Sequence, residues 1–198
     1  MSRHRTTPKA KLTRKRGLCT WCGEPVEPPR QSWCSDECLH QYKLRSWPGY
    51  ARSLVFERDH GVCALCGIDT EAMERRLSGL HSRAQAAYRG DPRVRSVDRP
   101  PGETEGRLAA YRWLIAEARQ LLLEHGFKPE QFLWSTGNRT SRSLWDADHI
   151  VPVCEGGGEC DLDNYRTLCV PCHRRVTAGL ARRRAAARRG QLTLGGVE

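Results

Sequence analysis

Eight of the ten cysteines in this 198-residue chain occur in four closely spaced pairs. Two thiolates separated by two or three residues bind one tetrahedral metal ion from a tight turn, whereas a disulfide across such a turn is usually strained. The pairs therefore predict two structural zinc sites, formed by Cys63, Cys66, Cys169 and Cys172 and by Cys19, Cys22, Cys34 and Cys38. Cys154 and Cys160 remain, and we interpret them as free thiols or packing groups.

Composition narrows the class of protein. Charged residues make up 28% of the chain, and no apolar run approaches the roughly 18 to 20 residues that cross a bilayer, which argues against a membrane protein. The N-terminus has no apolar stretch behind its charges and so does not resemble a secretory signal. We therefore expect a cytoplasmic, nucleoid-associated protein whose cysteines stay reduced.

The positive charge is concentrated at the two ends. Residues 1–16 carry seven Lys or Arg and residues 173–189 carry seven Arg, with no acid in either segment, while the whole chain has a formal net charge of +10. Such charge suits a polyanion, most often nucleic acid, although a solubilising tail is the alternative. The predicted DNA-binding residues follow the last cysteine pair: Arg174, Arg175, Arg182, Arg183 and Arg184.

Turn residues and apolar spacing predict a mixed α+β chain in four parts. We expect a disordered basic arm over 1–17, an N-terminal zinc module over 18–47, a larger domain over 48–177 and a basic helix and tail over 178–198. A helical insert of about 70–140 interrupts the larger domain, with apolar stripes over 70–87 and 105–125 and a linker over 89–102. Strands are expected at 144–153 and 161–168, followed by a helix from about 171 to 189. Trp21, Trp33 and Trp47 are assigned to the core of the zinc module.

The last of these elements carry a set of residues suited to phosphodiester chemistry. His149 is separated from Asn164 by 14 residues, and Asn164 from His173 by 8. Histidine titrates near neutrality, so His149 suits a general base that takes a proton from water. Asp148 and His173 offer an oxygen and a nitrogen to one divalent ion. Because Asp148 and His149 would point to opposite faces of a regular strand, the strand must end or bulge there.

These residues and the interleaved cysteine pairs resemble an HNH endonuclease of the ββα-metal fold, in its four-cysteine zinc subtype. Further motifs, WCSDEC (33–38), YARSLVFERDHGVC (50–63) and GGGEC (156–160), resemble the HNH domain fused to Swi/Snf-type annealing helicases. The resemblance implies hydrolysis of DNA with Mg²⁺ or Mn²⁺, leaving a 5′-phosphate and a 3′-hydroxyl. It implies that Asn164 either binds that ion or orients the His149 loop. Whether the chain has a helicase or another repair protein as its partner is left open by the sequence.

Three alternatives remain at the level of sequence. The chain is a metal-dependent endonuclease of DNA repair or defence, a non-catalytic zinc-based DNA-binding module, or a restriction-type nuclease for modified DNA. The intact Asp-His, Asn and His series favours an enzyme, since a binding module has no need of it. The N-terminal zinc module is interpreted as structural, with direct DNA contact as its alternative.

Overall fold

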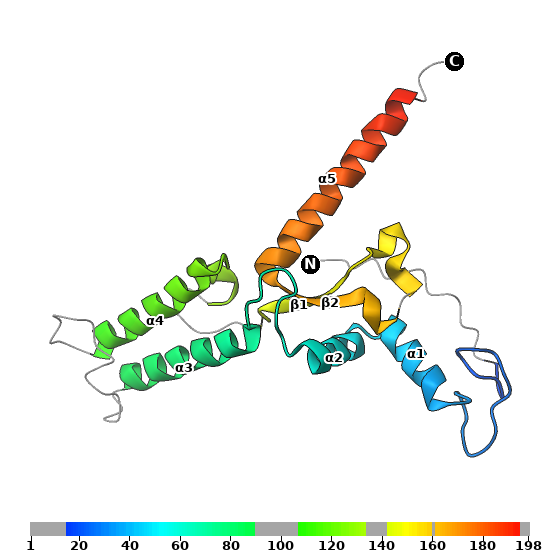
Figure 1. The fold of residues 1–198 in the computed structure, drawn as a ribbon. Coiled ribbons are helices and arrows are strands. Elements are labelled where there is room, and N and C mark those ends of the chain that lie inside the picture. The colour runs from blue at the N-terminus through cyan, green and yellow to red at the C-terminus, as the bar shows by residue number, and fades with distance from the viewer. Residues whose placement is uncertain (1–14, 90–106, 134–141, 160, 195–198) are drawn as a thin grey trace. The chain divides into compact units, whose positions relative to one another are not determined.

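A computed structural model describes residues 15–89, 107–133, 142–159 and 161–194 (Figure 1). The predicted arm over 1–17 therefore lies mostly outside the described residues, as does the expected linker over 89–102. Helices and strands follow the order α1, α2, α3, α4, β1, β2, α5. The mixture of helices with a two-stranded sheet confirms the predicted α+β class.

The sheet pairs β1 (Trp145–His149) with β2 (Tyr165–Cys169), and α5 (Val170–Leu194) follows directly. The first strand is shorter than the predicted 144–153, because Pro152 precedes a 3₁₀ turn over Val153–Glu155. The chain divides into two compact units, Met1–His60 with Ala147–Thr167 (unit one) and Gly61–Asp146 with Leu168–Glu198 (unit two). Each unit therefore contains part of both strands.

Unit one contains α1 (Asp36–Ser46) and α2 (Pro48–Asp59). Ser35 caps α1 because its hydroxyl accepts a hydrogen bond from the Cys38 backbone N–H at 3.1 Å. Proline at the first position of α2 loses no intrahelical hydrogen bond there, which suits a helix start. Trp47, between the two helices, is 54% exposed, so its assignment to the core is wrong.

The end of α2 is tied to β2 by an arginine and an aspartate. Arg58 donates hydrogen bonds to the Leu162 and Tyr165 carbonyls at 3.0 and 2.7 Å. Asp59 accepts from the Thr167 backbone N–H at 3.0 Å and pairs with Arg58 at 2.6 Å. Backbone groups near the start of β2 thus find their partners on the side chains of α2.

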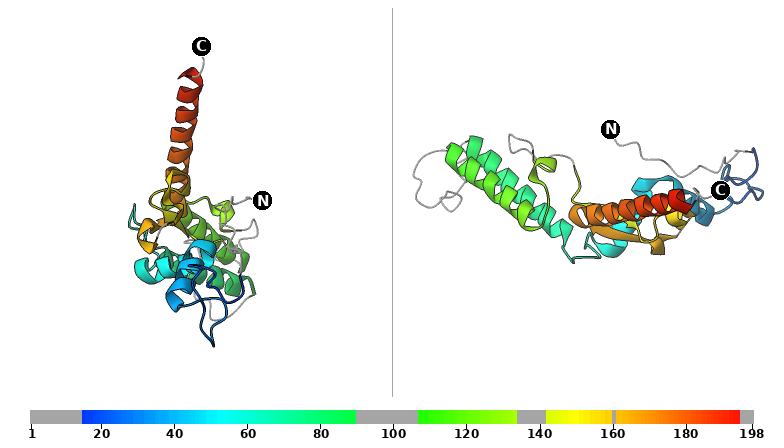
Figure 2. Two further views of the ribbon diagram at one scale, coloured as in Figure 1. Left: turned by 90° about the vertical axis from the view of Figure 1, so that its right-hand side faces the viewer. Right: turned by 90° about the horizontal axis from the view of Figure 1, so that it is seen from above.

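Unit two is built around a helical pair, α3 (Thr70–Arg89) and α4 (Arg107–Glu124), which lie side by side (Figures 1 and 2). Their buried apolar residues join one core with the cysteines of the second cluster. Members of this core include Met73, Leu77, Leu122, Phe127, Phe132, Leu133, Leu144, Leu168, Cys63, Cys169 and Cys172. The insert therefore packs directly against the cysteine cluster.

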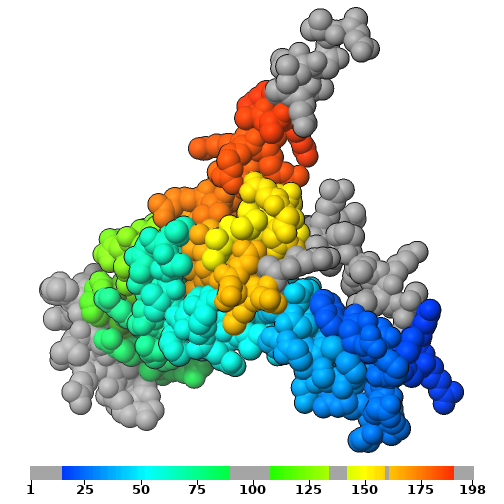
Figure 3. All heavy atoms as spheres, turned by 45° about the vertical axis from the view of Figure 1, so that its right-hand side comes forward, coloured from blue at the N-terminus to red at the C-terminus, as the bar shows by residue number. Residues whose placement is uncertain are grey.

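α5 begins within this core and continues beyond it. Val170 and Cys172 are buried, whereas every residue of 181–189 is exposed (Figure 3). The helix is continuous from 170 to 194, so it crosses the domain boundary that we expected after residue 177 without a break. Among the described residues, none of the helices has the length and apolar composition needed to span a membrane.

Candidate metal centres and nuclease site

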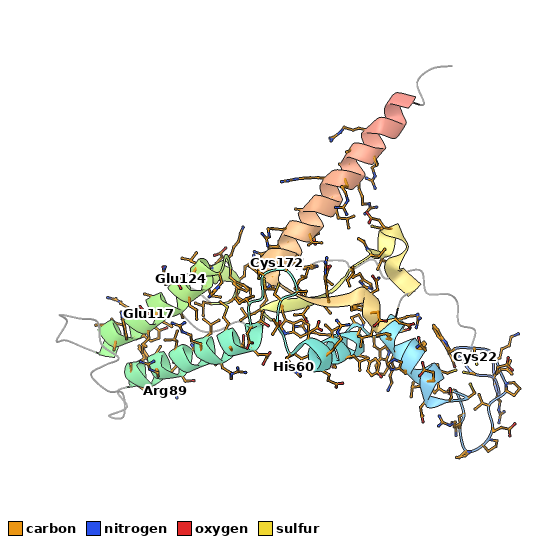
Figure 4. All side chains as sticks on the ribbon, in the orientation of Figure 1. Cys22, His60, Arg89, Glu117, Glu124 and Cys172 are labelled. Atoms are coloured by element: carbon orange, nitrogen blue, oxygen red, sulfur yellow. The ribbon has the colours of Figure 1, made fainter. Side chains whose placement is uncertain are left out.

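The first cysteine cluster lies in unit one, around the start of α1. Cys19 and Cys22 flank a turn, Cys34 precedes α1 and Cys38 lies in its first turn; Figure 4 labels Cys22. The four sulfur atoms all lie within 4.8 Å of one another, with 3.4 Å between Cys22 and Cys34 and between Cys34 and Cys38. A tetrahedral zinc ion with Zn–S bonds of 2.3 Å separates its sulfurs by about 3.8 Å, so this spacing fits zinc.

The second cysteine cluster lies in unit two and joins segments far apart in the sequence. Cys63 and Cys66 precede α3, Cys169 ends β2 and Cys172 lies in the first turn of α5 (Figure 4). Their sulfur atoms also lie within 4.8 Å of one another, and the Cys66 and Cys169 sulfurs are 3.7 Å apart. None of these distances approaches the 2.05 Å of a disulfide, and all eight thiols are free.

The protein backbone favours thiolate at one position in each cluster. Burial alone raises the pKa of the Cys19 thiol, but hydrogen bonds from the Cys22 and Cys34 backbone N–H groups outweigh it and lower this pKa to about 6. In the second cluster burial again raises the pKa of the Cys63 thiol. Hydrogen bonds from backbone N–H groups, the one of Cys169 among them, outweigh burial and lower this pKa to about 7. Zinc binds the thiolate form, so this environment suits a zinc ligand.

The predicted metal ligand Asp148 contacts an arginine. Nε and Nη2 of Arg166, on β2, donate to Asp148 Oδ2 at 3.1 and 3.0 Å. This ion pair is well covered, with 13% of the Asp148 side chain and 21% of the Arg166 side chain exposed. Arg166 carries no sequence signal of this role, because an arginine within a strand has no distinctive spacing.

His149 is the last residue of β1 and packs against an aromatic ring. Its imidazole lies 4.3 Å, centroid to centroid, from the ring of Tyr165 at the start of β2. Burial lowers the pKa of His149 below its usual 6.5, while the nearby Asp148 carboxylate acts in the opposite direction. The lowered pKa favours the neutral ring, which is the form that accepts a proton.

Asn164 holds the loop that follows His149. Its side-chain oxygen accepts from the Val151 backbone N–H at 2.7 Å, and its side-chain nitrogen donates to the Val151 and Gly157 carbonyls at 3.0 and 3.1 Å. The loop is so tight that a Cβ at Gly157 would lie 1.8 Å from the Val151 oxygen, so only glycine fits. These contacts correspond to the loop-orienting alternative for Asn164.

His173 lies in the first turns of α5, in unit two, and contacts a carboxylate that the sequence analysis passed over. The distance from His173 Nδ1 to Asp146 Oδ2 is 3.2 Å. Asp146 precedes Asp148 by two residues, so the alternation of a strand places the two carboxylates on the same face of β1. The alternation does not distinguish Asp146 from any other residue on that face, so its role rests on the contact with His173.

The predicted site residues are divided between the two units. Asp148, His149 and Asn164 belong to unit one, whereas His173 belongs to unit two. In the described part of the chain, the groups of three or more metal-ligating His, Cys, Asp or Glu side chains are the two cysteine clusters. Cys154 is exposed and free, and Cys160 lies outside the described residues.

The first two of the five predicted DNA-binding arginines donate hydrogen bonds to residues of unit two. Arg175 donates to the Cys172 sulfur at 3.0 Å, and Arg174 donates to the side-chain oxygen of Gln131. Arg182, Arg183 and Arg184 lie in the exposed half of α5. The arginines nearest the cysteine cluster therefore contribute to its surroundings.

Comparison with known proteins agrees with this geometry. Residues 134–179, which include β1, β2 and the start of α5, match the family model described as HNH endonuclease. This segment is similar to the HNH endonuclease family. The match confirms the predicted resemblance, and it covers Asp148, His149, Asn164 and His173.

The wider resemblance is confirmed by curated relatives. The chain is 32% identical over 183 residues to the protein named DNA annealing helicase and endonuclease ZRANB3 of Mus musculus, and 33% identical over 184 residues to that of Homo sapiens. Each alignment covers 88% of this chain and 14% of the relative. No solved structure matches the chain. The chain therefore resembles these relatives over most of its own length but spans only about a seventh of theirs.

Proposed function

We propose that this chain is a metal-dependent DNA endonuclease that hydrolyses a phosphodiester bond and leaves a 5′-phosphate and a 3′-hydroxyl. The observation that carries the proposal is the neutral-favouring environment of His149 at the end of a strand in the HNH segment. Of the candidate processes, DNA repair and defence both use such cleavage. The chain would act in the cytoplasm, associated with the nucleoid.

His149 is assigned as the general base. Its ring rests on Tyr165, which restricts its orientation, and burial keeps it unprotonated at neutral pH. It would take the proton from the water that attacks the scissile phosphorus. Asn164, by fixing both backbone groups of Val151, keeps the loop after His149 in one conformation.

Asp148 and His173 are assigned to the catalytic divalent ion. A carboxylate oxygen and an imidazole nitrogen suit Mg²⁺ or Mn²⁺, which when bound neutralises charge on the phosphate and on the departing 3′ oxygen. Asp146 acts as a positioning residue, because its contact with Nδ1 makes Nε2 the nitrogen of His173 that would bind the ion. Arg166 holds the Asp148 carboxylate in place.

The two cysteine clusters are proposed as structural zinc sites. In unit two, three of the four cysteines lie in the same core as α3 and α4, so the metal would hold the start of α5 and therefore His173. Arg175, which donates to the Cys172 sulfur, offsets part of the negative charge of four thiolates. In unit one, the zinc would fix the start of α1.

One observation favours the non-catalytic DNA-binding module as a second candidate. Asp148 is engaged by Arg166, and both ends of the Asn164 amide are engaged by the loop. A zinc-based binding module would retain such contacts for stability alone. The two candidates differ in one measurable respect, which is whether the phosphodiester bond breaks.

The deciding experiment incubates zinc-loaded protein with supercoiled, linear and branched DNA in Mg²⁺ or Mn²⁺, beside the His149→Ala variant. Wild type should nick or cut the DNA, and the variant should bind with the same affinity but cut about 10²- to 10⁴-fold more slowly. Equal cutting by both proteins would remove His149 from the mechanism. Binding without cutting by the wild type on all three DNAs would favour the non-catalytic module.

A further inference from the structure

The exposed half of α5 is unusual in its charge. From 170 to 194 the helix contains seven arginines and no acidic residue, and all of 181–189 is exposed. Arg184 and Arg188 are four positions apart, and like charges at that spacing on a helix repel one another. A polyanion removes that repulsion, which makes nucleic acid the fitting partner.

Four of the five arginines at 181–189 fall on two different faces of the helix. At 100° per residue, Arg184 and Arg188 lie within about 20° and 60° of the direction of His173. Arg182 and Arg189 lie about 180° and 160° away from that direction. Arg183 lies about 80° from the direction of His173, between the two faces. One face therefore aligns the proposed ligand of the catalytic ion with Arg184 and Arg188, and the opposite face carries Arg182 and Arg189.

The opposite face has a different role at the start of the helix. Arg175 lies about 200° from His173 around the axis, and it donates to the sulfur of Cys172. That face is therefore directed at the cysteine cluster where the helix leaves the core. The face of His173 is the one that faces the proposed chemistry.

We propose that the face of α5 shared by His173, Arg184 and Arg188 is a guide for the DNA backbone, which contacts phosphates on one side of the cut. This inference rests on the proposed function, since it takes His173 as the position of the scissile phosphate. With a rise of 1.5 Å per residue, Arg184 and Arg188 lie about 16 and 22 Å along the axis from His173. The proposed guide takes the duplex axis parallel to α5, so that at 3.4 Å per base pair these arginines lie beside phosphates about five and seven base pairs from the cut.

Neighbouring arginines provide a matched test. Arg188 and Arg189 have the same charge, lie at the same depth along α5 and are both exposed, but they occupy different faces. The variants are Arg184→Ala, Arg188→Ala and, as the control, Arg189→Ala. Alanine is the best helix former, so circular dichroism should show the helix intact in each.

The measurement is duplex affinity as a function of salt, made without divalent ions so that no cleavage occurs. Each phosphate contact contributes about 0.9 to the slope of log affinity against log salt. Arg184→Ala and Arg188→Ala should each lower that slope by about 1, and Arg189→Ala should leave it nearly unchanged. Equal effects of Arg188→Ala and Arg189→Ala would overturn the proposed face.

A second readout separates this inference from the proposed function. With Mg²⁺ present, shortening the duplex on one side of the cut to fewer than about five base pairs should remove the difference between wild type and Arg188→Ala. If Arg188→Ala lowers the salt slope and Arg189→Ala does not, but wild type never cuts DNA, the backbone guide stands and the nuclease proposal fails. If wild type cuts while all three variants bind alike, the nuclease stands and the guide is wrong.

Discussion

Asp146 shows how much of this site depends on a single contact. The spacing of His149, Asn164 and His173 drew attention to those residues, whereas an aspartate two positions before Asp148 has no motif of its own. Only the 3.2 Å distance to His173 Nδ1 gives it a role. A carboxylate in that place fixes which imidazole nitrogen is presented to the ion.

Removing this carboxylate should weaken binding of the catalytic ion. We expect Asp146→Ala to raise the Mg²⁺ concentration for half-maximal cleavage by about 10- to 100-fold, because the ring of His173 loses its orientation. Asp146→Asn retains a hydrogen-bond acceptor and should lose less. Elemental analysis serves as the control and should still find the zinc content of the wild type. An unchanged Mg²⁺ dependence in Asp146→Ala would contradict the positioning role.

Asp59 gives a prediction about pH. Its hydrogen bond from Arg58 holds the pKa of this carboxyl below its usual value, against the opposing effect of burial, and Thr167 adds to the lowering. A carboxylate with a lowered pKa stabilises the fold above the unfolded-state value of about 3.9, and this stabilisation is lost as the pH falls through the lower folded-state pKa.

The Asp59→Asn variant should therefore be less stable than wild type at neutral pH, by about 1–3 kcal/mol. The difference in urea midpoint between the two proteins should shrink as the pH falls below about 3.9. Taking the difference removes effects that both proteins share, such as loss of metal in acid. A difference in urea midpoint that stays constant down to low pH would show that the charge of Asp59 contributes nothing to the stability of the fold.

At the scale of elements, the loop from Ile150 to Gly157 depends on one asparagine. Asn164→Asp separates the two roles that the sequence left open. Aspartate is a better ligand for a divalent ion, but it cannot donate to the Val151 and Gly157 carbonyls. If Asn164 orients the loop, the variant should lose about 1–3 kcal/mol of stability and most of its cleavage. Wild-type cleavage in Asn164→Asp would support the ligand role.

The elements themselves were predictable to different degrees. Apolar spacing located α3 and α4, because both helices bury one stripe in a shared core, and that periodicity is visible in the sequence. The sequence predicts that β1 ends or bulges near His149, but it does not show what ends the strand. The tight turn depends on contacts of Asn164 and Gly157, which lie further along the chain. Trp47 was misplaced because an aromatic residue between two helices gives no sign of which way it faces.

For the whole molecule, the two cysteine clusters are the places where a bound metal would stabilise the fold. The cysteine pairs predicted both clusters, because two thiolates separated by two or three residues can bind the same tetrahedral ion. The sequence could not foretell that Arg175 would donate to Cys172, since an arginine in a basic run has the pattern of a DNA contact. Three buried cysteines of unit two also lie in its apolar core, so binding of the proposed zinc would be coupled to packing there.

Elemental analysis should find about two zinc ions per chain in freshly isolated protein. Cys22→Ser should retain the zinc of unit two, and Cys66→Ser that of unit one, so each variant should hold about one ion. Cys66→Ser should also lower the thermal unfolding temperature, because its cluster lies within the main core. Two ions in either variant, or close to none in the wild type, would contradict the assignment of the clusters.

The most direct test of the central claim is the single-turnover cleavage rate of an end-labelled duplex by His149→Gly, with and without added imidazole. We expect wild type to leave 5′-phosphate and 3′-hydroxyl ends, and the variant to cut about 10²- to 10⁴-fold more slowly while binding DNA normally. Imidazole, which restores the missing base, should recover part of that rate. Cleavage by His149→Gly at the wild-type rate without imidazole would show that the proton goes elsewhere.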